Sequence, residues 1–76
     1  MIGYILTTEQ ATQVQGVFIT PYLFINCVQD IDGTWFFFGN EQDKETFKDS
    51  EYMWLFDLPQ GEYIPKPSTF PFNETN

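Results

Sequence analysis

The stretch FINCVQDIDGTWFFFG, residues Phe24–Gly39, carries the strongest structural signal in this chain. Runs of β-branched and aromatic residues flank an Asp-Ile-Asp-Gly sequence at 30–33, and an Asp-Gly pair between such runs is typical of a β-hairpin. Two registers are open. A two-residue turn would pair Val28 with Phe37, whereas a four-residue loop would pair Val28 with Trp35. We favour a loop that contains a glycine bulge.

The second arm of this hairpin, Trp35-Phe36-Phe37-Phe38, is apolar at every position. A strand with one face in water alternates between apolar and polar residues, so both faces of this arm are expected to be covered. The hairpin is therefore predicted to form the centre of the core.

On the N-terminal side, Ile2–Leu6 is a short apolar run that predicts a first strand. Thr7 and Gln10 have the spacing of a capping box, which predicts a helix over residues 8–15. Gly16 suits the left-handed position that ends a helix.

The long apolar segment before the hairpin contains a proline. Pro21 has no backbone donor, so we expect a break, bulge or strand edge near Thr20-Pro21 and a strand over Tyr22–Gln29.

After the hairpin, Asn40 is placed as the N-cap of a second helix over residues 41–49, which has one large apolar residue, Phe47. Glu51–Leu58 has large apolar residues at alternate positions on both faces and is predicted to be the last strand. From Pro65 onward, proline, serine, threonine and phenylalanine predict an extended arm.

These elements predict an α+β fold: a small antiparallel sheet of three to four strands with two short helices, in one domain over residues 1–64, and an extended Pro-rich C-terminal arm over 65–76. The helices supply too little apolar surface to cover both sheet faces, so the uncovered face is a predicted interface. The expected interface residues are aromatic and proline side chains of the sheet and the arm: Trp35, Phe36, Phe37, Phe38, Tyr52, Trp54, Phe56, Pro65, Pro67, Phe70 and Phe72.

The composition restricts the possible partners. Eleven carboxylates against three lysines give a formal net charge of −8, which argues against direct binding to nucleic acid or to an anionic membrane. Residues 1–6 contain no positive charge, so we expect no signal peptide, and no apolar run approaches the roughly 20 residues of a membrane span.

The sequence offers no catalytic set, no metal site and no cofactor site, and we expect a protein that is not an enzyme. There is no histidine, and no local spacing brings carboxylates, Tyr, Lys or Cys27 together. Asp30 and Asp32 are interpreted as turn residues that bond nearby backbone donors. Cys27 is interpreted as a buried free thiol within a strand.

Two segments, CVQDIDGTWFFF (Cys27–Phe38) and LPQGEYIPKP (Leu58–Pro67), on a small acidic body that starts at Met1, resemble small virion-associated structural proteins of tailed bacteriophages. The resemblance implies a protein that is made in the host cytoplasm and resides in the virion, in the capsid, tail or fibre. Its partners would be further copies of itself or other virion proteins, with the arm docked on a neighbour.

One alternative comes from the acidic residues in and beside the second helix: Glu41, Asp43, Glu45, Asp49 and Glu51. A row of carboxylates can imitate DNA phosphates, so the chain could inhibit a host defence or nucleic-acid-binding protein. Lys44 and Lys48 interrupt that row. Salt separates the alternatives, because binding by a phosphate mimic falls steeply with added salt and an aromatic interface does not.

Overall fold

The computed structural model describes residues 1–67 of the chain. Its elements are β1 (Ile2–Leu6), α1 (Thr8–Val14), β2 (Phe18–Thr20), β3 (Leu23–Phe24), β4 (Cys27–Gln29), β5 (Trp35–Phe37), α2 (Glu41–Phe47), the 3-10 helix η1 (Met53–Asp57) and β6 (Gln60–Glu62).

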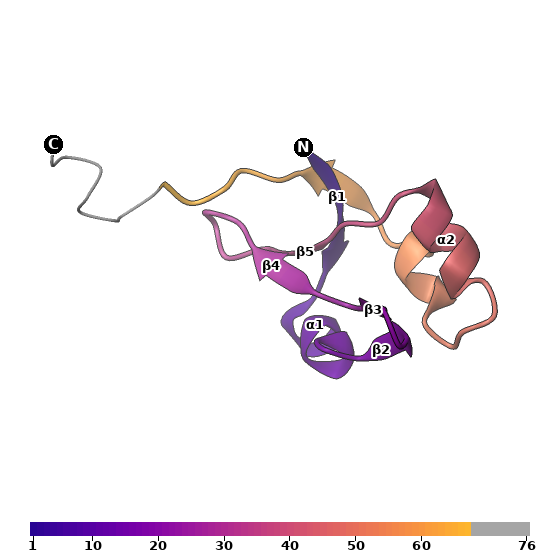
Figure 1. Ribbon diagram of the computed structural model, residues 1–76. Coiled ribbons are helices and arrows are strands. Elements are labelled where there is room, and N and C mark those ends of the chain that lie inside the picture. Colours follow the sequence, from indigo (N-terminus) through magenta and orange to yellow (C-terminus); the bar gives the residue numbers. More distant parts are fainter. Residues whose placement is uncertain (68–76) are drawn as a thin grey trace, which may run out of the picture.

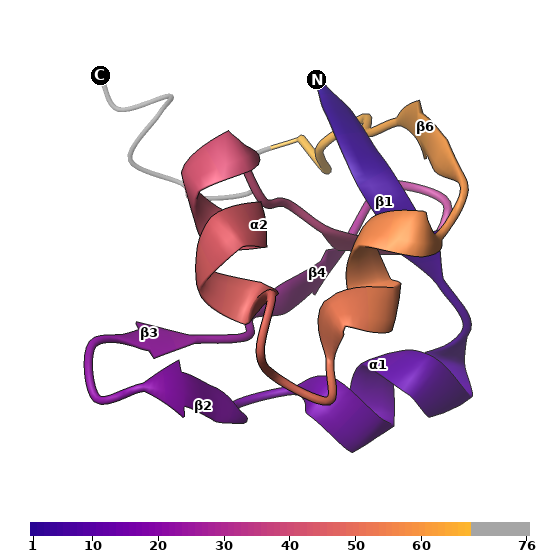
Figure 2. The same cartoon turned by 90° about the vertical axis from the view of Figure 1, so that its right-hand side faces the viewer.

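Four strands form an antiparallel sheet in the order β4-β5-β1-β6, and β2 pairs with β3 in a separate two-stranded ribbon. Figure 1 shows the β2–β3 ribbon below the sheet, on the far side of the molecule from the chain that leaves β6. Figure 2 shows α2 and η1 side by side in front of the sheet, with α1 beneath them. The fold is α+β, as predicted.

The hairpin of β4 and β5 is present, but its register is neither of the two predicted. Val28 lies opposite Phe36. The loop is closed by the Asp30 N–H, which donates to the Thr34 carbonyl at 2.9 Å, and by the Gly33 N–H, which donates to the Asp30 carbonyl at 3.0 Å. Gly33 has a φ of 84°, a left-handed conformation that glycine adopts without steric cost. The glycine bulge is therefore confirmed.

Both predicted helix starts are confirmed. Thr7 and Gln10 form a complete capping box at α1, and Asn40 forms one with Asp43 at α2. In each box the side chains satisfy backbone donors that the first helical turn leaves without partners. After α1, Gly16 has a φ of 78°, as its predicted role requires.

The strand predicted over Tyr22–Gln29 is interrupted. The Ile25 N–H donates to the Val17 carbonyl at 2.8 Å, and the Gly16 N–H donates to the Ile25 carbonyl at 2.8 Å. These bonds turn Ile25 into the core, where its side chain is fully buried. The segment is thus divided into β3, which pairs back with β2 across the predicted break at Thr20-Pro21, and β4, which joins the main sheet.

The strand predicted over Glu51–Leu58 is wrong, because this segment forms the 3-10 helix η1. Leu55 and Phe56 are neighbours in sequence and both are buried. Successive residues of a strand point to opposite faces, whereas a helical turn can direct neighbours toward the same core. The place beside β1 is taken instead by β6.

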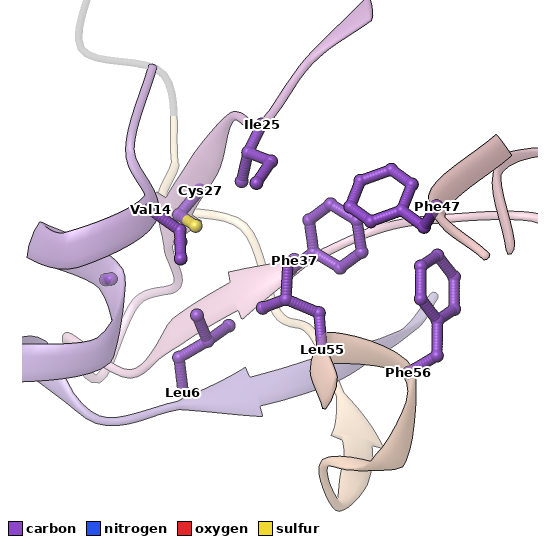
Figure 3. Packing of buried hydrophobic residues seen from close by; sticks show 9 residues of the cluster. Leu6, Val14, Ile25, Cys27, Phe37, Phe47, Leu55 and Phe56 are labelled. Atoms are coloured by element: carbon purple, nitrogen blue, oxygen red, sulfur yellow. The ribbon is translucent and has the colours of Figure 1, made fainter. Parts of the chain in front are cut away.

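The core lies between the sheet and the helical elements. It is built around three phenylalanines, Phe37 of β5, Phe47 of α2 and Phe56 of η1, whose ring centroids are 5.1–5.7 Å apart. Figure 3 shows these rings gathered at one end of the cluster, with Leu6 and Val14 at the other. Each ring pair is tilted or edge-to-face, the arrangement that aromatic quadrupoles favour.

Candidate binding surface

Three of the predicted interface residues are buried inside the protein itself. Phe36, Phe37 and Phe56 are 2%, 4% and 8% exposed. Phe37 and Phe56 belong to the core beneath the helices. Their assignment to an interface is therefore wrong for the conformation described, since their side chains have no surface left for a partner.

The second face of the sheet is covered by the chain that follows β6. Tyr63 packs edge-to-face against Phe36 at 5.4 Å and against Phe38 at 5.2 Å between ring centroids. Its N–H donates to the Met1 carbonyl at 2.7 Å, and the Ile31 N–H donates to the Ile64 carbonyl at 2.9 Å. These bonds hold residues 63–64 across the sheet between its edge and the hairpin loop. The prediction of an uncovered aromatic sheet face is thus wrong.

The other predicted interface residues differ in how far they are exposed to solvent. Trp35, Phe38, Tyr52 and Trp54 are half-buried against the core or the second face, and Pro65 and Pro67 are exposed. Phe70 and Phe72 lie outside the residues that the structure describes.

Among residues 1–67, the most exposed aromatic side chains lie on the β2–β3 ribbon, where the sequence did not predict them. Phe18, Tyr22 and Phe24 are 64%, 95% and 50% exposed. Phe18 and Phe24 are cross-strand partners with ring centroids 5.5 Å apart. The turn between the strands is held by the Tyr22 N–H, which donates to Thr20 Oγ1 at 3.1 Å. We call these three residues the ribbon patch.

A pocket of about 250 Å³ opens beside the ribbon patch, between β3, β4, β5 and α2. Leu23, Phe24 and Val28 supply apolar surface to it, and polar surface of nearly equal extent is also present, with Asn26 and Asp43 as its polar side chains. Phe24 belongs both to the pocket and to the ribbon patch, so the two form one continuous surface.

Asp30 has the structural role expected of it. Its Oδ1 accepts hydrogen bonds from the Asp32 N–H at 2.9 Å and from the Thr34 N–H at 3.0 Å. The side chain is buried, and these bonds compensate for the loss of water. Within residues 1–67, no group of three or more His, Cys, Asp or Glu side chains is close enough to hold a metal ion.

The acidic residues of α2 are partly engaged in local contacts. Asp43 Oδ2 accepts a hydrogen bond from the Asn40 N–H at 3.1 Å, and Lys48 Nζ lies 3.8 Å from Glu45 Oε1. Both members of that ion pair are exposed, so it adds little stability. The surface of α2 therefore mixes positive and negative groups.

Cys27 is buried, as expected of a free thiol in this strand. Burial raises the pKa of the Cys27 thiol from 9.0 to about 11, because it disfavours the charged thiolate. The unfolded chain therefore loses this proton at lower pH than the folded protein, and the stability contributed by the neutral buried thiol is lost as pH rises from about 9 to about 11.

We expect a thiol reagent at pH 8 to modify folded Cys27 at least about 100-fold more slowly than the urea-unfolded chain, since two pKa units reduce the thiolate fraction about 100-fold. Absorbance of the released chromophore measures both rates, with a free cysteine peptide as the control for urea. Equal rates for the folded and unfolded chains would contradict the burial of this side chain.

No helix among the described residues is both long enough and apolar enough to cross a bilayer. No protein-family model, characterised protein or solved structure matches this chain.

Proposed function

We propose that this chain is a non-enzymatic structural or assembly protein that binds protein partners through the ribbon patch and the arm that begins at Pro65. The observation that carries the proposal is the exposure of three aromatic side chains on one short ribbon, with Tyr22 almost fully in solvent. Apolar groups that gather on a surface in this way are typical of sites where another protein docks.

The ribbon patch has the composition of an interface centre. Aromatic side chains are enriched in interface cores, and tyrosine combines a large apolar ring with a hydroxyl that can hydrogen-bond. The ribbon is two-stranded and separate from the main sheet, and isolated two-stranded ribbons are only marginally stable in water. A partner packed on the patch would bury its aromatic rings and would stabilise the ribbon.

The resemblance to small virion-associated proteins of tailed bacteriophages supplies the setting for this proposal. In that setting the chain is a component of a capsid, tail or fibre, is made in the host cytoplasm, and binds further copies of itself or other virion proteins. The arm from Pro65, exposed at least to Pro67, would add a second attachment to a neighbour.

Sedimentation velocity tests the proposal, with the 8.9 kDa chain run alone and then with material from its source particle. We expect part of the chain to move into a complex of defined, larger mass that persists when salt is added, as hydrophobic contacts do. A matched chain that ends at residue 64 should fold and bind less. A protein that stays at 8.9 kDa in every mixture would contradict the proposal.

A further inference from the structure

We propose that the pocket beside the ribbon patch binds one segment of a partner protein in which a basic residue, preferably arginine, adjoins a bulky apolar side chain. The proposal rests on the proposed function, which it extends by specifying the chemistry of the partner. It is carried by three properties of the pocket: its size, its carboxylate and its half-exposed aromatic rim.

The size of the pocket suits a single side chain better than a small molecule or a cofactor. Pockets that bind small molecules and cofactors usually measure about 300–1,000 Å³, and this one measures about 250 Å³. Its accessible apolar walls are formed by half-buried Leu23 and Val28 and by half-exposed Phe24. A single phenylalanine, leucine or methionine side chain would bury its apolar surface against these walls.

The polar groups of the pocket favour a basic residue next to that side chain in the partner's sequence. Asp43 lines the pocket, and its carboxylate has lone pairs for several donors, so the bond from the Asn40 N–H leaves capacity for an incoming cation. Phe24, at the rim, is 50% exposed. A guanidinium group can pair with a carboxylate and also stack on an aromatic ring, which an ammonium group does less well.

The charge of the whole chain favours this partner over a second copy. The net charge is −8, so two copies repel each other, whereas a basic segment is attracted toward the acidic first turn of α2, which carries Glu41 and Asp43. Electrostatic complementarity of this kind selects partners and speeds their encounter.

The test is an NMR titration of the 15N-labelled full chain with a capped hexapeptide, Ser-Gly-Arg-Phe-Gly-Ser, at millimolar concentration. We expect saturable shifts of the backbone amides of Leu23, Asn26, Val28 and Phe47. Replacement of the peptide's arginine by glutamate, or of its phenylalanine by alanine, should weaken binding about tenfold or more. Shifts spread over the whole surface, no saturable shift, or equal binding of the glutamate peptide would overturn the proposal.

The matched variants are Asp43→Asn and Glu41→Gln. Asparagine keeps an amide oxygen for the capping box but removes the charge in the pocket, so Asp43→Asn should bind the arginine peptide about three- to tenfold more weakly. Glu41→Gln removes one charge from the same helical turn outside the pocket and should bind nearly as the parent does. Equal weakening by both variants would show only a general effect of charge and would overturn the proposal.

Two further outcomes separate this inference from the proposed function. If the same amides shift when the protein alone is concentrated, the occupant is a second copy, and the basic-segment proposal fails while assembly through this surface stands. If the peptide does not bind but loss of the ribbon patch still abolishes complex formation with source material, the proposed function also stands and only the pocket's assigned occupant is wrong.

Discussion

Replacement of Phe37 by alanine is expected to lower the free energy of unfolding by about 3–5 kcal/mol, the cost of removing a large aromatic side chain from a packed core. Phe37 is 4% exposed and its ring contacts those of Tyr4, Phe47 and Phe56. A domain of this size has little stability beyond that amount, so the variant should be largely unfolded at 25 °C. Urea unfolding followed by near-ultraviolet circular dichroism measures the effect.

Phe24→Ala is the matched control, since it removes the same side chain from a half-exposed position. It should lower the free energy of unfolding by about 1 kcal/mol or less. If Phe37→Ala kept the parent's urea midpoint, or if Phe24→Ala unfolded the protein as completely, the division between core and surface aromatics would be wrong.

The largest effect on binding is expected from a triple variant of the ribbon patch, Phe18→Ser, Tyr22→Ser and Phe24→Ser. Central aromatic residues commonly contribute about 2 kcal/mol or more each to an interface. One such loss alone lowers affinity about 30-fold, so the triple variant's affinity for the partner present in source material should fall by at least that factor. Binding to immobilised protein, with the partner quantified by mass spectrometry, measures the loss.

The triple variant should remain folded, because its three side chains are at least half exposed in the parent. A double variant, Gln13→Ser and Gln42→Ser, changes exposed polar residues on the two helices and should leave binding unchanged. A folded triple variant that binds its partner with the parent's affinity would contradict the assignment of the ribbon patch.

Local chemistry explains the parts of the fold that the sequence predicted correctly. The capping boxes at Thr7 and Asn40 and the left-handed glycines Gly16 and Gly33 depend on bonds within a few residues of each site. Such interactions are available before the rest of the chain is in place. They locate both helices and the hairpin loop, although not the register of the hairpin, which also depends on how β5 pairs with β1.

Long-range contacts explain the errors. The segment over residues 51–58 has apolar residues on both sides of an alternating pattern, which suits a strand as well as a buried turn. Only the packing of Leu55 and Phe56 against the core distinguishes the two. Likewise, Tyr63 covers Phe36 from 27 positions away in the sequence, a contact that no local pattern reveals.

The candidate site was missed for a related reason. The break at Thr20-Pro21 was predicted, but the chain after it, Tyr22–Gln29, was expected to run as one strand into the hairpin. The two bonds between Ile25 and residues 16–17 instead separate β3 from β4, and the short ribbon then carries Phe18, Tyr22 and Phe24 into solvent. The available signal for a separate turn was Pro21, which has an aromatic residue three positions before it and aromatic residues one and three positions after it.

Site-specific photo-crosslinking in the native source tests whether this protein binds its partners through the ribbon patch. A benzophenone amino acid would replace Tyr22 in one protein and Thr12, an exposed residue of α1, in a second. We expect an adduct of one discrete mass from position 22 and none from position 12. No adduct from position 22, or the same adduct from both positions, would contradict binding through the ribbon patch.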